Sequence, residues 1–229
     1  MCFSANASLG AGLALTVIGV LSIKKVQRPS LLLFASIPFI FGVQQLAEGA
    51  LWLTLPHPEY VNTQRLATYV FLFFAQIVWP LWVPTAILLA EKKETRKNIQ
   101  KVLAALGLLM SFYLAYCLLA FHVEAKIVGK HITYFQDYPV LLKPYIMLLY
   151  LVVTITPTFF SHVKHMWMLG VCILISYIIT MLFYEHYVLS VWCFFSSIIS
   201  LSIYAIIRGI ANTEWGKGEV LQLNPSPAK

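Results

Sequence analysis

The segment FGVQQLAEGALWL, residues 41–53, places three hydrogen-bonding side chains inside an otherwise apolar run. Gln44, Gln45 and Glu48 stand there within two helical turns. A carboxylate or an amide in hydrocarbon is costly unless another group pairs with it. The segment therefore predicts a membrane helix whose polar side chains find partners in the interior of the protein.

The composition of the whole chain indicates a membrane protein. Of the 229 residues, 60% are hydrophobic and only 11% are charged. A soluble domain of this length cannot bury so much apolar surface. The formal net charge of +7 does not favour nucleic acid as a partner, because basic residues in membrane proteins report orientation.

Seven apolar runs approach the roughly 20 residues that a helix needs to cross a bilayer. They predict an all-α integral membrane protein, a bundle of seven transmembrane helices over residues 1–208 followed by a cytoplasmic tail over residues 209–229. The predicted spans are residues 4–23, 31–54, 66–90, 102–122, 140–160, 166–186 and 188–207.

The basic residues set the expected orientation. Twelve Lys and Arg residues flank the spans on one side and four on the other, and the richer side is usually cytoplasmic. The N-terminus is therefore predicted outside, the C-terminus inside, and the protein in the cell's inner (plasma) membrane as a multi-pass protein. In the first span the basic residues follow the apolar segment, whereas in a cleavable signal peptide they precede it. We therefore expect this span to remain in the protein as a helix.

This orientation gives each polar residue a depth. Gln44 and Glu48 share one helix face, and Glu48 lies about 9 Å below the outer end of its span at 1.5 Å per residue. Cys193 in the last span lies at a similar depth. We expect a polar cavity that opens to the outer face, with further lining or supporting side chains from several helices. These are Gln44, Gln45, Gln76, Trp79, Tyr184, Trp192, Ser196 and Ser197.

Three other segments carry structural expectations. Pro80 and Pro84 should bend their helix and free backbone carbonyls. EAKIVGKHITYFQDYP, residues 124–139, alternates around Gly129 and Lys130, which predicts a hairpin that covers the outer mouth as a small lid. EKKETRK, residues 91–97, is interpreted as a solvated cytoplasmic loop.

A zinc site is the leading functional hypothesis. Thiolate, carboxylate and imidazole from Cys2, Glu48, Cys193 and His186 form a plausible ligand set with room for an open position. A zinc-bound water with a lowered pKa would support hydrolysis or hydration of a small or lipidic substrate. In that scheme Glu185 serves as general base, while Gln44 and Gln45 orient Glu48.

Several alternatives remain open at this point. Cys2 and Cys193 can instead form a disulfide at an oxidising outer face. Glu48 can be protonated and serve only packing, or act as a protonatable carboxylate in a transporter or sensor. A retinal protein is excluded, since residues 188–207 contain no lysine for a Schiff base. The expected partners are membrane lipids and a small-molecule or lipid substrate.

Three motifs together carry a resemblance. The chain opens with MCFSANAS, continues with FGVQQLAEGALWL and has SVWCFFSSIIS near the start of its last span. In these motifs it resembles an uncharacterised family of bacterial and archaeal multi-span membrane proteins, which has Met-Cys-Phe-Ser-Ala, Gln-Gln-x-x-Glu-Gly and Trp-Cys-Phe-Phe motifs. The resemblance implies a small integral membrane protein of about seven helices and brings no established activity.

Overall fold

The computed structural model describes residues 4–139, 143–163, 165–183, 195 and 198–211, and this part of the chain is mostly helical. Its labelled elements are α1 (Ala5–Lys24), α2 (Leu32–Thr54), α3 (Val61–Leu72), α4 (Trp79–Ala90), α5 (Glu94–Ala120), β1 (Val123–Val128), β2 (His131–Gln136), α6 (Lys143–Phe159) and α7 (Met166–Phe183). A π-helical segment, Phe73–Val78, joins α3 to α4 without a break. A further short helix follows at Ile198–Ala211.

Four helical stretches are long and apolar enough to cross a membrane, which supports a membrane protein. They are Ala5–Lys24, Pro29–Thr54, Pro58–Ala90 and Glu94–Ala120. Three shorter apolar helices follow at Tyr145–Phe159, Met166–Leu182 and Ile198–Ala211.

The first two predicted spans match the bounds of α1 and α2 to within one residue, and the next two coincide with the later parts of longer helical stretches. The third helical stretch begins near residue 58 and not at 66, and α5 begins at Glu94 and not at 102. Hydropathy detects only the part of a helix that matches hydrocarbon, whereas the polar first turns also contain good helix formers. The start of the last predicted span, 188–207, lies outside the described residues, and the described helix there runs from Ile198 to Ala211.

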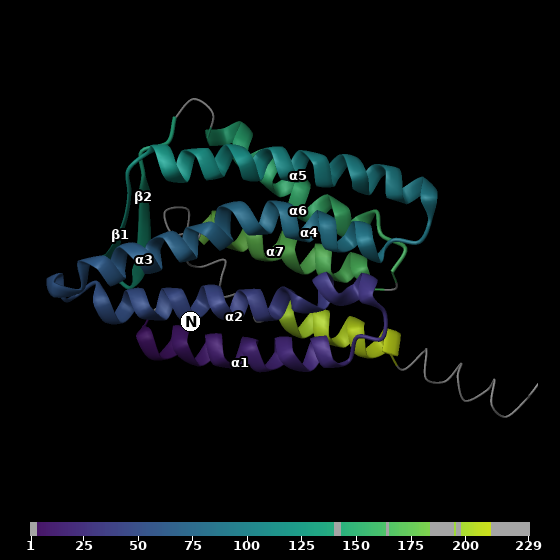
Figure 1. Ribbon diagram of the computed structural model, residues 1–229, viewed down its shortest axis with the longest axis horizontal. Coiled ribbons are helices and arrows are strands. Elements are labelled where there is room, and N and C mark those ends of the chain that lie inside the picture. Colours follow the sequence, from purple (N-terminus) through teal and green to yellow (C-terminus); the bar gives the residue numbers. More distant parts are fainter. Residues whose placement is uncertain (1–3, 140–142, 164, 184–194, 196–197, 212–229) are drawn as a thin grey trace, which may run out of the picture.

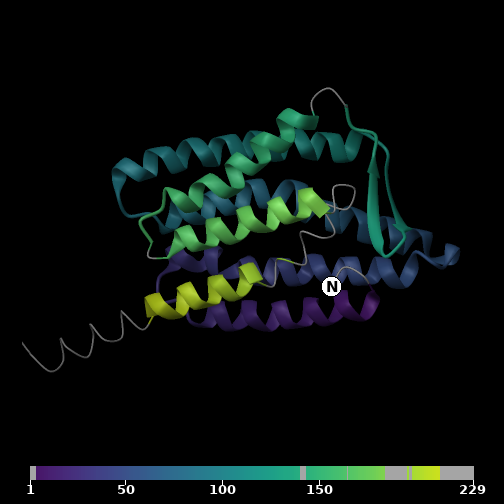
Figure 2. The ribbon, with the colours of Figure 1, turned by 180° about the vertical axis from the view of Figure 1, so that it is seen from behind.

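The helices lie side by side along the long axis of the molecule (Figure 1). Helices α1 and α2 form one edge and α5 the opposite edge, with α4, α6 and α7 between them, and the view from behind agrees (Figure 2). The β1–β2 hairpin crosses one end, hereafter the hairpin end. The opposite end carries Lys24, Lys25, Lys92 and Lys93 and is called the basic end.

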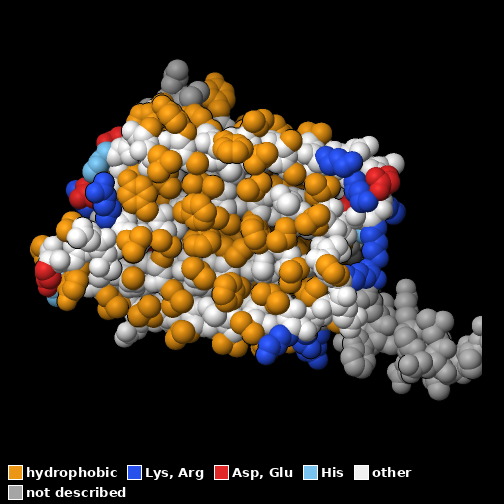
Figure 3. Space-filling view, viewed as in Figure 1, with side chains coloured by type: hydrophobic (Ala, Val, Ile, Leu, Met, Phe, Trp, Pro, Cys, Tyr) orange, Lys and Arg blue, Asp and Glu red, His pale blue; other side chains and the backbone are white. Residues whose placement is uncertain are grey.

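The face of the molecule seen in Figure 3 is apolar across its middle. Hydrophobic side chains form a broad belt, and charged side chains gather at the two ends (Figure 3). Large apolar side chains of the described helices are exposed, with Leu119 82% exposed, Leu182 73% and Phe112 66%. Exposure of this kind is unfavourable in water and expected in hydrocarbon, since scattered exposure is normal but a continuous belt is not.

Glycines set the contact between α1 and α2. A Cβ at Gly42 would lie 2.5 Å from Thr16 Oγ1, and one at Gly49 would lie 2.5 Å from the Leu9 side chain. At Gly19 a Cβ would collide with the backbone of Phe39. Small residues allow membrane helices to approach this closely.

The predicted hairpin is present. β1 and β2 pair antiparallel, with Val128 opposite His131 across the two-residue turn, and Gly129 has a φ of 63°. That left-handed conformation is readily available to glycine. Tyr134 stacks on Phe71 with ring centroids 4.6 Å apart. The hairpin also packs on the ends of α2 and α3 through a small apolar cluster, Leu51, Ala67, Ala125 and Ile132.

Candidate functional site

The polar face of α2 is turned inward. Gln44 and Gln45 are each 1% exposed, and Glu48 is fully buried. Gln45 Nε2 donates to Glu48 Oε2 over 2.7 Å, and Trp79 Nε1 of α4 donates to Gln44 Oε1 over 2.8 Å. The polar side chains of this segment therefore have partners within the protein, as their cost in hydrocarbon requires.

The π-helical segment between α3 and α4 exposes backbone carbonyls to other helices. Proline has no N–H, so Pro80 cannot donate to the carbonyl that a π-turn would offer it five residues earlier, that of Ala75. Tyr150 of α6 fills this place, because its hydroxyl donates to Ala75 O over 2.6 Å. Ser111 of α5 donates to Ile77 O over 2.8 Å. Neighbouring hydroxyls thus satisfy carbonyls of the widened turn.

Gln76, in the same segment, connects it to the hairpin end. Its Nε2 donates to Gln136 Oε1 of β2 over 3.0 Å, and its Oε1 accepts from the Tyr138 hydroxyl over 2.9 Å. Burial raises the pKa of the Tyr138 hydroxyl, which therefore keeps its proton and remains a donor. The hairpin is thereby fixed to the middle of a membrane-length helix by one amide side chain.

A cavity lies beside the polar face of α2, between helices that come from both halves of the chain. The cavity has a volume of about 80 Å³, enough for several waters or a small organic molecule. All but two of the lining side chains are apolar or aromatic, and α2, α4, α6, α7 and the last helix all contribute. The lining residues are Phe34, Ile37, Phe41, Gln44, Ala75, Trp79, Val83, Ile87, Tyr150, Thr154, Leu169, Ile173, Ile199 and Ile203.

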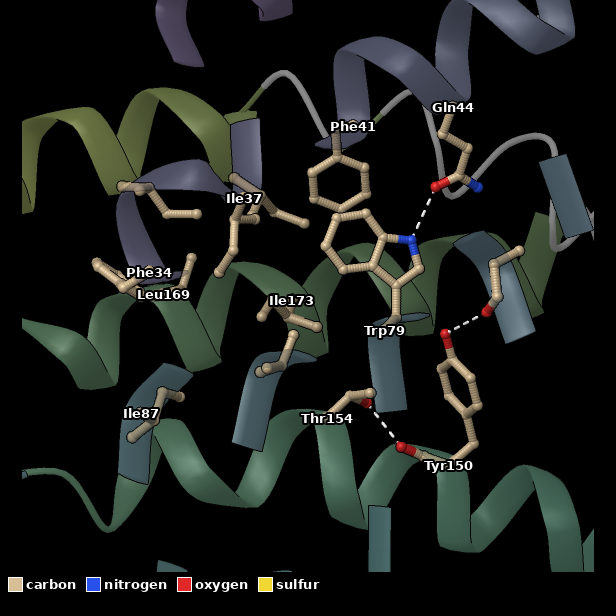
Figure 4. Close-up of a pocket in the computed structure, with 14 residues that line it drawn as sticks. Phe34, Ile37, Phe41, Gln44, Trp79, Ile87, Tyr150, Thr154, Leu169 and Ile173 are labelled. Carbon is tan, nitrogen blue, oxygen red and sulfur yellow. Dashed lines mark hydrogen bonds between the residues drawn. The ribbon is translucent and has the colours of Figure 1, made fainter. Parts of the chain in front are cut away.

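The polar groups of the cavity gather at one side (Figure 4). Gln44, the indole nitrogen of Trp79 and the Tyr150 hydroxyl lie there, while Phe34 and Leu169 lie at the other side. Thr154 is near Tyr150, where its Oγ1 donates to Tyr150 O over 2.7 Å. None of the described lining residues carries a charge. The cavity thus has the usual composition of a small-molecule site, apolar with a few polar groups.

The residues predicted for the site separate into two groups. Glu48 is buried beside Gln45, Gln44 and Trp79 are joined at the cavity, and Gln76 holds the hairpin. The rest of the predicted set lies outside the described residues: Cys2, Tyr184, Glu185, His186, Trp192, Cys193, Ser196 and Ser197. Within the described part of the chain, no group of three or more His, Cys, Asp and Glu side chains can hold a metal ion. The zinc site therefore stays a prediction.

A second buried carboxylate, Glu91, corrects the interpretation of EKKETRK as a solvated loop. Its side chain is fully buried just after α4, and its oxygens accept from the backbone N–H groups of Lys92 (3.0 Å), Lys93 (2.9 Å) and His162 (2.9 Å). The imidazole of His162 also pairs with it. Residues from Glu94 onward belong to α5, so only a short connection remains of the predicted loop.

The electrostatics of Glu91 follow from these contacts. Burial alone would raise the pKa of the carboxyl, but the hydrogen bonds from the backbone of Lys93 and His162 and the electrostatic interaction with the His162 side chain hold that pKa below its usual value. A sequence signal for this site existed. An acid at the end of a helix opposes the helix dipole, so it needs a partner there.

Comparisons with known proteins give a family and no activity. A family model described as "Family of unknown function (DUF6629)" matches residues 1–217. Searches of curated proteins and of solved structures find no match. The chemistry of the described residues is therefore the ground for a functional proposal.

Proposed function

The chain belongs to this family of unknown function, and from its cavity we propose that it is a multi-span membrane protein that binds a neutral, largely apolar small molecule between its helices. It acts as a transporter or a sensor for that molecule. Its seven helices span the inner membrane, with the N-terminus outside and the hairpin as a lid on the outer side.

The cavity is the single observation that carries this proposal. Its walls come from α2, α4, α6, α7 and the last helix, so a molecule bound there contacts most of the helical body at once. Apolar walls favour an apolar ligand, and the absence of charge among the described lining residues disfavours an ion. A site shared by so many helices is also suited to couple binding to a change in their packing.

Filling the cavity tests the proposal. The probe is 1-bromodecane, whose bromine quenches tryptophan fluorescence and should reach Trp79 in the cavity wall. We expect saturable quenching in the detergent-purified protein. The double variant Ile87→Phe with Ile173→Phe narrows the cavity from α4 and α7 and should weaken binding at least tenfold.

The matched control changes the outward faces of the same two helices. Leu89 and Ile175 are 48% and 51% exposed, so Leu89→Phe with Ile175→Phe adds the same side chains without entering the cavity. This control should bind the probe as the unmodified protein does. Equal binding by both double variants, or quenching that never saturates, would refute the proposal.

A zinc enzyme remains the second candidate, and the burial of Glu48 favours it. A carboxylate held by the Gln45 amide at 2.7 Å is oriented as a metal ligand needs to be. Cys2, Cys193 and His186 would complete the zinc site, and Glu185 would act as the base in hydrolysis or hydration. Elemental analysis tests it: about one zinc per chain is expected, with loss in Cys2→Ser and in Glu48→Gln. Protein without bound zinc that is fully folded would rule this candidate out.

A further inference from the structure

The π-helical segment Phe73–Val78 contacts both the cavity and the hairpin. We infer that it couples them: a molecule bound in the cavity stabilises the β1–β2 hairpin in its attached position, and detaching the hairpin weakens the binding of that molecule. This inference rests on the proposed binding function and specifies how binding at the same site is regulated.

One side of the π-helical segment belongs to the cavity wall. Ala75 lines the cavity, and so does Trp79, the first residue of α4 directly after the segment. The Ala75 carbonyl accepts from the hydroxyl of Tyr150, another lining residue, over 2.6 Å. A molecule in the cavity therefore contacts residues whose positions depend on the geometry of this turn.

The next residue in the chain, Gln76, holds the hairpin. Its Nε2 donates to Gln136 Oε1 of β2 over 3.0 Å, and its Oε1 accepts from the Tyr138 hydroxyl over 2.9 Å. Gln76 is 7% exposed, so little water competes for these hydrogen bonds. The residue that holds the hairpin is thus the direct neighbour of Ala75, which lines the cavity, and a movement of the turn affects both.

The turn has two accessible geometries. In the π geometry of this structure, the Trp79 N–H donates to the Phe74 carbonyl, five residues earlier. In an α-helix it would donate to the Ala75 carbonyl, which accepts from Tyr150 here. Pro80 has no N–H and donates in neither geometry, so fewer backbone hydrogen bonds must change than in a helix without proline. The change would also rotate the amide side chain that holds the hairpin.

The attached position of the hairpin carries an energetic cost. The Nε2 atom of Gln136 is buried and has no hydrogen-bond partner in the part of the chain that the structure describes. An unpaired buried donor is unfavourable, and water can hydrate it when the hairpin opens. This cost offsets part of the stability that the hairpin gains from Gln76 and from its apolar contacts, so attachment can respond to a ligand.

The direction of the coupling follows from the structure. The cavity is formed here while the hairpin is attached to Gln76, so a molecule that fills the cavity favours the attached state. Coupling between two equilibria is reciprocal. Detaching the hairpin should therefore weaken ligand binding by the same factor by which the ligand stabilises attachment.

Hydrogen exchange of the hairpin amides tests the inference in the detergent-purified protein. We expect a saturating concentration of 1-bromodecane to slow exchange in β1 and β2 roughly two- to tenfold, the range that one net hydrogen bond gives. Helix α1 contributes none of the described lining residues and is the reference for general stabilisation. Its exchange should stay unchanged.

Three variants assign the effect to the contact with Gln76. Gln136→Leu removes the acceptor of Gln76 and should abolish the slowing of hairpin exchange. It should also weaken binding of the probe, measured by tryptophan quenching, by the same roughly two- to tenfold factor. Tyr138→Phe removes the other hydrogen bond at nearly constant shape and should reduce both effects. Thr133→Val is the control, because Thr133 lies three residues before Gln136 and therefore on the opposite face of β2; it should leave both effects intact.

Every other result contradicts the inference. If 1-bromodecane quenches saturably but hairpin exchange does not change, or α1 slows equally, the coupling is wrong and the cavity proposal stands. A full effect in both Gln136→Leu and Tyr138→Phe would show that Gln76 does not carry the coupling. Quenching that never saturates would overturn the cavity proposal and this inference together.

Discussion

At the residue scale, two glutamates are buried, but the local sequence indicates the burial of only one of them. Glu48 stands out in the sequence because it interrupts a long apolar run, and it is fully buried, with a hydrogen bond from Gln45. Glu91 stands beside two lysines in a charged segment and reads as solvated, yet its side chain is also fully buried. Its partners are backbone groups and His162, which is 71 residues away in the sequence. Local composition cannot show such a partner.

The contacts of Glu91 predict a stability that depends on pH. Glu91→Gln should lower the free energy of unfolding by about 2 kcal/mol at pH 7, because a neutral amide replaces a carboxylate that accepts three backbone hydrogen bonds. The pKa of Glu91 is lower in the folded protein than its ordinary value of 4.5. The contribution of the charge is therefore complete above pH 4.5 and is lost as the pH falls through the folded pKa.

Denaturant unfolding in detergent, repeated from pH 7 to pH 3, measures this effect. The difference between the protein and Glu91→Gln should be largest at pH 7 and shrink below pH 4.5. Glu94→Gln is the control, since Glu94 is an exposed residue paired only with Lys97 in the described contacts, and such surface pairs contribute little. A constant difference across the pH range would show that the charge of Glu91 does not stabilise the fold.

At the scale of elements, the sequence predicts the features that depend on local pattern. The hairpin follows from alternation around Gly129 and Lys130, and α1 and α2 follow from apolar runs with clear ends. The π-helical segment before Pro80 was not predicted, although freed carbonyls were. Its geometry depends on hydroxyls from Ser111 and Tyr150, which lie on helices much later in the chain.

The candidate site also has features that follow from the local sequence and features that depend on how the helices pack. The inward turn of Gln44 and Glu48 follows from the cost of polar groups in hydrocarbon. The bond from Trp79 to Gln44 and the apolar cavity beside it depend on how α2, α4, α6 and α7 pack. No spacing in one segment encodes that packing.

Two glycines of α1 give opposite predictions for the same substitution. Gly19→Ala should destabilise the protein by about 1–3 kcal/mol, because the new Cβ would meet the backbone of Phe39 and force α1 and α2 apart. Gly10→Ala meets nothing within 4 Å and should stabilise α1 by about 0.5–1 kcal/mol through helix propensity. Thermal unfolding in detergent measures both. Equal shifts in the two variants would show that the close contact of α1 and α2 is not needed for stability.

At the scale of the whole molecule, the two ends of the helical body differ in the number of basic residues, and this difference predicts the orientation of the protein in the membrane. Among the described side chains, nine Lys and Arg residues lie at the basic end and three at the hairpin end. Basic residues beside membrane spans are retained on the cytoplasmic side. The described nine are Lys24, Lys25, Arg28, Lys92, Lys93, Arg96, Lys97, Lys101 and Arg208, against Arg65, Lys126 and Lys130.

This asymmetry predicts which end a reagent outside the cell can reach. In a background in which the four native cysteines are replaced by serine, Lys126→Cys on β1 should react in intact cells with a thiol reagent that does not cross membranes. Lys93→Cys between α4 and α5 should react only after the membrane is opened. Both positions are exposed at opposite ends of the helical body, so accessibility to water does not distinguish them and only the bilayer does. If the cysteine at residue 93 reacted in intact cells and the cysteine at residue 126 did not, the orientation would be the opposite of the predicted one. It would also place the hairpin, which Gln76 ties to the cavity-lining segment through Gln136, on the cytoplasmic side of any ligand path.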